Sequence, residues 1–181
     1  MNNCVGCFTP LRAFWRSVDC LEKEDFDLIN AELRENWVGV SLQIRNGGCV
    51  FNLLNVYAPH GIQEKLALWQ DFRRLAALLD SSPAIFIGDF NEVRFQRERI
   101  NCNIRIREMR VFNSWIEDSN LLEIPLDNAN FIWIGPNGKR SKLDRALSNS
   151  EWLSQTDWTL KALSRKNSDH RGILLRSKQQ N

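Results

Sequence analysis

The chain has 181 residues, of which 43% are hydrophobic and 25% are charged, and its net charge is +2. This size and composition are typical of one globular domain and exclude a disordered chain. No run of about 18 apolar residues occurs, so we expect no membrane-spanning helix, and the N-terminus lacks the apolar stretch of a secretory signal. Five cysteines without regular spacing favour a reducing compartment. We therefore expect an intracellular protein, nuclear or cytoplasmic, that is not secreted.

The first 34 residues carry the weakest structural signal. Apolar residues recur there at loose helical spacing, but seven acids lie between positions 19 and 35. So many charges in a short stretch favour a solvated segment. We place no chemistry in residues 1–34 and expect the folded domain to span residues 35–178.

Regular patterns begin near residue 38. Strict alternation predicts a β-hairpin of residues 38–44 and 49–56 around a glycine turn. Residues 62–80 have apolar side chains at spacings of three and four, which predicts an amphipathic helix. Residues 84–87 are apolar throughout, as in a strand covered on both faces. A polar loop and a second helix, at about 106–120, follow.

The last third of the chain predicts further strands. Residues 131–134 and 143–147 flank a Pro-Asn-Gly turn and predict a second hairpin, and Trp152 begins a short helical piece. Strands at 158–163 and 172–176 complete the pattern. Helices that alternate with buried strands indicate a layered α/β domain.

Polar side chains that are suited to catalysis or binding follow the apolar strand. It ends on Gly88-Asp89-Phe90-Asn91, whose carboxylate and carboxamide suit a water, a hydrated cation or a phosphate oxygen. Alone, this motif is equally compatible with a simple Asx-type turn. Two distant clusters favour a site, namely Ser141-Lys142-Leu143-Asp144-Arg145 and Ser168-Asp169-His170. Taken singly, the acid of the first is compatible with a local ion pair, and the histidine of the second with a structural role.

In this order, Gly-Asp-Phe-Asn, Ser-x-Leu-Asp-Arg and Ser-Asp-His resemble the endonuclease/exonuclease/phosphatase family of metal-dependent phosphodiesterases, which includes abasic-site endonucleases and DNase I. Stretches between about residues 35 and 176 are similar to the endonuclease domain of plant LINE-type retrotransposons, among them Asn55 to Pro59, Glu64-Lys65, Leu68-Trp69 and Ser150 to Leu153. The resemblance implies a DNase I-like, four-layer α/β sandwich of two mixed β-sheets with flanking helices. It also implies Mg2+-dependent nicking of DNA.

The resemblance implies roles for the polar residues. Asp89 and Asn91 would align the attacking water and bind the phosphate. Asp144 would hold His170, which would polarise a phosphate oxygen or exchange a proton with the water.

Two further residues would lie beside this group. Asp169 would assist near the Mg2+ as a metal ligand, and the phenol of Tyr57 would reach the phosphate. Arginines between residues 94 and 110, and basic residues between 161 and 178, would draw DNA toward the site. Scattered arginines are more often only a solvated surface.

The sequence also departs from the family that it resembles. Family members begin with strands that carry an Asn motif and a glutamate that is the principal Mg2+ ligand, and both would precede the matched region. None of the glutamates before residue 36 follows an apolar strand in the family's manner. We therefore expect a domain that lacks its first strands, with weak or lost Mg2+ binding and severely impaired catalysis. Ile132 also stands where relatives place a threonine.

Three other interpretations stay open. A catalytically dead remnant that still binds nucleic acid would show salt-dependent DNA binding without cleavage. A small-molecule phosphoesterase of the same superfamily would hydrolyse a soluble phosphoester but not plasmid. An unfolded pseudogene product would lack cooperative unfolding.

Overall fold

A computed structural model describes residues 26–45, 48–165 and 167–177. Its centre is a six-stranded mixed sheet, in which β3 and β4 are the parallel pair and the other neighbours are antiparallel. Across the sheet the strands run in the order β1 (Phe26–Leu33), β2 (Trp37–Ile44), β3 (Val50–Tyr57), β4 (Ala84–Asp89), β9 (Asp144–Ser148) and β6 (Leu122–Glu123).

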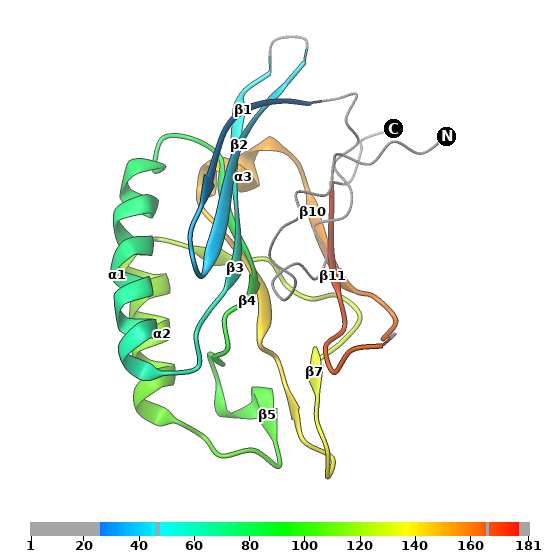
Figure 1. The fold of residues 1–181 in the computed structure, drawn as a ribbon. Helices are drawn as coiled ribbons and strands as arrows, with labels where there is room; N and C mark the ends of the chain where they lie inside the picture. Colours follow the sequence, from blue (N-terminus) through cyan, green and yellow to red (C-terminus); the bar gives the residue numbers. More distant parts are fainter. Residues whose placement is uncertain (1–25, 46–47, 166, 178–181) are drawn as a thin grey trace.

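Two long helices cover one face of this sheet (Figure 1). Helix α1 (Ile62–Leu78) is the crossover between the parallel strands β3 and β4, and α2 (Ile106–Asp118) packs beside it. Their shared core is aromatic, with Trp69 stacked on Trp115 at 4.8 Å and Phe72 and Phe86 edge-on at 5.1 Å. Neither helix, nor any other in the described ranges, is long and apolar enough to cross a membrane.

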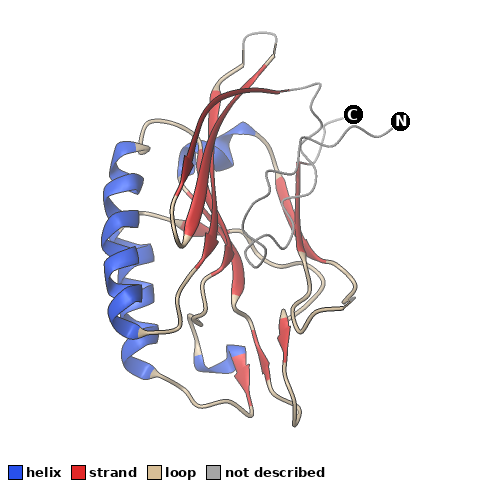
Figure 2. Ribbon diagram, viewed as in Figure 1, coloured by secondary structure: helices blue, strands red, loops and turns tan. Residues whose placement is uncertain are grey.

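The opposite face of the sheet packs on a second sheet. This sheet has two antiparallel strands, β10 (Trp158–Ala162) and β11 (Ile173–Ser177), next to the short helix α3 (Ser150–Gln155). Ile85 of β4 packs with Leu160 and Trp152 on this side, whereas Phe86 faces the long helices. The expectation that β4 is buried on both faces is thus confirmed. Helices, central sheet and second sheet form three layers among the described residues (Figure 2).

A small third sheet lies at the end of the molecule where β4 stops (Figure 1). Its strands are β5 (Arg99–Ile100), β8 (Arg140–Ser141) and β7 (Trp133–Ile134), in that order, and the 3-10 turn η1 (Gln96–Glu98) precedes β5. The predicted Pro136-Asn137-Gly138 turn closes the β7–β8 hairpin, with positive φ at Asn137 and Gly138.

Two strand predictions need correction. Residues 144–148 do not pair with residues 131–134; they form β9 and pair with β4, because the tight turn lets only residues 140–141 reach β7. Residues 26–33, expected to be part of a solvated segment, form the edge strand β1. Most of its side chains are exposed, so its stability comes from backbone pairing with β2, which apolar alternation does not reveal. The rest of that segment, residues 1–25, lies outside the described residues.

Candidate active site

Strand pairing brings three of the predicted site residues to one edge of the central sheet. Asp89 is the last residue of β4 and lies opposite Asp144, the first residue of β9. Tyr57 ends β3 in register with Asp89 and is 40% exposed. His170 arrives from the loop between β10 and β11, where it forms a β-bridge with Trp133 of the small sheet.

His170 lies between the two carboxylates. Its Nδ1 is 2.8 Å from Oδ2 of Asp144, and its Nε2 is 3.8 Å from Oδ2 of Asp89. The shorter contact is a hydrogen bond, whereas the longer one is within ion-pair distance but too long for a hydrogen bond. If Nδ1–H donates to Asp144, Nε2 faces Asp89.

The surroundings shift the pKa of both Asp89 and His170 upward. Burial and the neighbouring charge of Asp144 raise the pKa of Asp89 to about 7, against the opposing effects of His170 and a backbone N–H. Burial lowers the pKa of His170, but its hydrogen bond with Asp144 and that carboxylate's charge outweigh burial, so the net direction is upward. Near neutral pH, Asp89 can therefore both accept and release a proton beside His170.

Asn91 is fixed in a sharp turn after β4. Its φ is +50°, its backbone N–H donates to Oδ1 of Asp89 at 2.8 Å, and its Nδ2 donates to the Ala58 carbonyl at 2.6 Å. The Asx-type turn considered from the sequence is thus present, and it lies at the site. Gly88 has φ +137°, and a Cβ there would stand 2.2 Å from the Val56 carbonyl oxygen, so this approach to β3 requires glycine.

Asp169 contacts the small sheet, although its charge also helps to raise the pKa of His170. Its carboxylate accepts a hydrogen bond from Nε1 of Trp133 at 3.0 Å, and its backbone carbonyl accepts one from Ile134 at 2.9 Å. It lines an open groove of about 460 Å³ together with the β7–β8 turn and Arg165. The structure therefore joins Asp89, Asn91, Asp144 and His170 in one contact network, with Tyr57 at the next strand end and Asp169 turned toward the hairpin.

The described residues contain no ready-made cluster of metal-ligand side chains. No group of three or more histidine, cysteine or acidic side chains in this part of the chain is arranged to hold a metal ion. An imidazole between Asp89 and Asp144 opposes a cation there, because the two would compete for the same carboxylates. The metal role of Asp169 stays a prediction.

Beneath the site lie buried charges that the sequence analysis missed. Lys65 is 1% exposed and its ammonium contacts Glu92, Glu108 and the Asn91 carbonyl. The sequence did contain a signal that Lys65 is buried, because this residue falls three positions after Ile62 and four before Trp69, on the apolar stripe of its helix.

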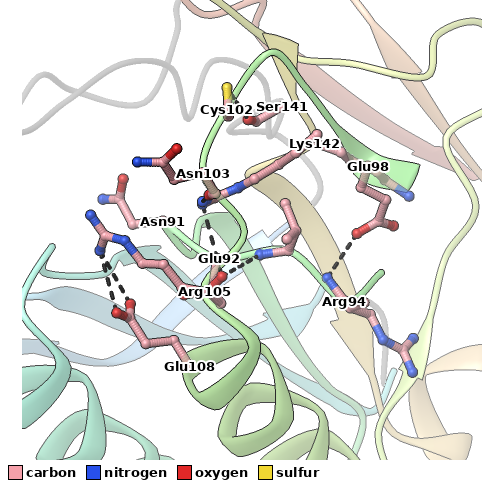
Figure 3. Close-up of polar contacts among 12 residues, drawn as sticks. Asn91, Glu92, Arg94, Glu98, Cys102, Asn103, Arg105, Glu108, Ser141 and Lys142 are labelled. Atoms are coloured by element: carbon pink, nitrogen blue, oxygen red, sulfur yellow. Dashed lines mark hydrogen bonds and ion pairs between the residues drawn. The ribbon is translucent and has the colours of Figure 1, made fainter. Parts of the chain in front are cut away.

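A second buried group surrounds Arg145, whose side chain is fully buried. It pairs with Glu98 and Glu123 and so joins β9 to the loop after β4 and to β6. Figure 3 shows Glu98 reaching back to Arg94, where its carboxylate accepts the backbone N–H at 2.8 Å. The neighbours Asp144 and Arg145 thus serve different networks, which follows from the alternation of side chains along a strand.

No family model and no curated protein matches the sequence. Solved structures do match, and they define the class of fold as that of the DNase I-like endonucleases. The endonuclease domain of TRAS1, a telomere-specific non-LTR retrotransposon, aligns with a TM-score of 0.65 and 15% identity, over 90% of this chain and 73% of that domain.

Two other similar structures come from outside retrotransposons. The AP endonuclease LMAP from Leishmania major aligns with a TM-score of 0.64 and 14% identity, over 82% of this chain and 56% of that one. A beta toxin from Staphylococcus aureus with bound magnesium ions aligns with a TM-score of 0.56 and 13% identity, over 79% of this chain. This chain spans 58% of that toxin's length. The fold is therefore that of the endonuclease/exonuclease/phosphatase family.

Proposed function

We propose that this chain is a phosphodiesterase of the DNA endonuclease type, of LINE retrotransposon origin. The observation that carries the proposal is the placement of His170 between Asp144 and Asp89. The fold shared with a non-LTR retrotransposon endonuclease domain supports it.

The chemistry of these side chains suits phosphodiester hydrolysis. The pKa of Asp89, about 7, allows its carboxylate to take a proton from an attacking water near neutral pH. A cationic His170, held in orientation by Asp144, would offset the negative charge that develops on a phosphate oxygen. The fixed carboxamide of Asn91 would bind the phosphate on the same side.

We further propose that catalysis by this chain is slow and only weakly stimulated by Mg2+. Mg2+ supplies charge neutralisation at the phosphate in enzymes that hold it well. No cluster of three or more ligand side chains is gathered among the described residues, and His170 occupies the space between the two carboxylates of the site. Mg2+ binds through few carboxylates and retains several waters, so the loss of one ligand weakens it severely.

DNA is the proposed substrate. Four arginines between residues 97 and 110 are exposed on the loop and helix that follow the site, and they would attract the sugar-phosphate backbone: Arg97, Arg105, Arg107 and Arg110.

Nicking of supercoiled plasmid tests the proposal, with and without Mg2+. We expect slow nicking by the wild-type protein, with loss in Asp89→Ala and His170→Ala. The matched controls are Asp71→Ala and His60→Ala, which remove an exposed acid and the other histidine and should leave nicking unchanged. Equal nicking by all variants would mean a contaminating nuclease and would refute the assignment.

A catalytically dead DNA-binding remnant is the second candidate, and the lack of a metal-ligand cluster among the described residues favours it. For this function we expect binding to duplex DNA that weakens steeply with salt. A folded wild-type protein that binds DNA but never nicks it would establish this candidate and refute the first.

A further inference from the structure

We propose that Lys65 is a positioning residue that sets the Asp89–Asn91 turn from beneath. The ammonium lies within hydrogen-bonding distance of the Asn91 carbonyl at 2.8 Å, Oε2 of Glu92 at 2.8 Å and Oε2 of Glu108 at 3.1 Å. A lysine has three N–H donors and no acceptor, so these contacts use its full capacity. One side chain thereby joins α1, the turn after β4, and α2.

The contact with Asn91 matters because this residue has a left-handed backbone. At φ +50° its peptide groups turn away from the direction of β4. Three contacts from three directions hold the residue: Lys65 on the carbonyl, Asp89 on the N–H, and Ala58 on the side chain. Lys65 supplies the one that fixes the peptide following Asn91, while the contact with Ala58 orients the carboxamide.

Two acids make the buried ammonium possible. Glu92 is fully buried and Glu108 is 14% exposed, and both form ion pairs with the ammonium. Arg99 lies 3.8 Å from the other oxygen of Glu92. In Figure 3, Glu108 also carries two contacts with Arg105, at the exposed margin of the group. The opposite charges of the group therefore offset one another.

Stability alone does not explain this arrangement. A buried ion pair can be replaced by apolar side chains of similar volume at little cost in stability, whereas removal of one partner leaves an unpaired charge. Lys65 lies on a helix stripe where Trp69 and Phe72 are packing residues, so an apolar side chain would fit there once Glu92 is neutral as well. What an apolar side chain cannot supply is a donor for the Asn91 carbonyl.

The test compares Lys65→Met/Glu92→Gln, which removes the buried charge pair together, with the wild-type protein. The matched control is Lys142→Met, because Lys142 is also a mostly buried lysine on a glutamate, Glu123, but has no contact with the turn. Amide hydrogen exchange of Asn91 is followed by NMR. This N–H reports the turn directly, because it donates to Asp89.

We expect exchange at Asn91 to accelerate by about tenfold or more in the double variant, with the α2 core amides unchanged and the control variant like wild type. Unchanged protection of Asn91 in a folded double variant would overturn the inference. A double variant that fails to fold would also overturn it, because Lys65 would then stabilise the whole domain.

The importance of the turn for chemistry rests on the proposed function, and a second measurement separates the two. If wild-type protein nicks plasmid, the double variant should lose kcat with little change in KM, since positioning acts in the transition state. If wild-type protein does not nick, the proposed function fails while the exchange result still decides the role of Lys65.

Discussion

Replacement of Asp89 by asparagine should stabilise the folded protein while it abolishes nicking. The carboxylate is buried, and its charge is repelled by that of Asp144 at the opposite position of β9. An asparagine has nearly the same shape, keeps an oxygen for the Asn91 N–H, and carries no charge. The variant therefore removes the unfavourable charge and leaves the turn in place.

The magnitude follows from the pKa of Asp89, which rises from 3.8 to about 7 on folding. A carboxyl group with a raised pKa binds its proton more tightly in the folded state. The contribution of this group to stability is therefore fully present below the pKa that it has in the unfolded state. That contribution is lost as pH rises through the pKa of the folded state. Each pKa unit corresponds to about 1.4 kcal/mol, so the loss is about 4 kcal/mol over the whole range and about 3 kcal/mol between about pH 4.5 and pH 8.

Urea unfolding followed by tryptophan fluorescence measures the effect, since the chain has seven tryptophans. The difference in unfolding free energy between Asp89→Asn and wild type should grow by about 3 kcal/mol in favour of the variant from about pH 4.5 to pH 8. A pH-independent difference, or a variant that is less stable at pH 8, would show that Asp89 is not held in an unfavourable charged state.

Three further predictions concern the residues around Asp89. Asp144→Asn should lower the pKa of His170, because the acceptor that favours its imidazolium loses its charge; an NMR titration measures it, with the chain's other histidine as reference. Burial would raise the pKa of Glu123, but the charges of Arg145 and other cations outweigh burial and hold this pKa at about 2. Wild type should therefore lose about 3 kcal/mol of stability relative to Glu123→Gln as pH falls from about 4.5 toward 2. Parallel acid-unfolding curves would contradict this. Gly88→Ala should destabilise by about 3 kcal/mol or more, because its Cβ would stand 2.2 Å from a carbonyl oxygen of β3; an unchanged thermal midpoint would refute it.

The strand that ends at Asp89 was predicted from the sequence pattern, whereas the family resemblance supplied its link with Asp144 and His170. Asp89 ends an apolar strand, and the carboxyl end of a strand is where α/β domains place polar groups. His170 lies in a loop before a strand, and that position alone predicts no site. The structure joins both, with Asp144, in one network. Both long helices were predicted to within two residues of their observed ends, because their apolar spacing is regular.

Pairing partners were harder to predict than elements. Residues 144–148 read as a strand, but nothing in their composition distinguishes a partner in residues 131–134 from a partner in β4. That choice depends on non-local packing, in which Leu147 joins the helix core and Ala146 the core of the second sheet. The edge strand β1 was missed for a related reason, since its exposed side chains show no periodic signal.

The buried charges connect stability with the choice between the two candidate functions. A fold that only binds DNA gains nothing from a carboxylate with a pKa near 7 at the edge proposed to bind phosphate, because that charge destabilises the domain and repels DNA. Asp89→Asn should therefore bind DNA more tightly in either case. Only in an endonuclease does the gain in affinity coincide with a loss of nicking, so binding and cleavage by this one variant, measured together, distinguish an enzyme from a binding remnant.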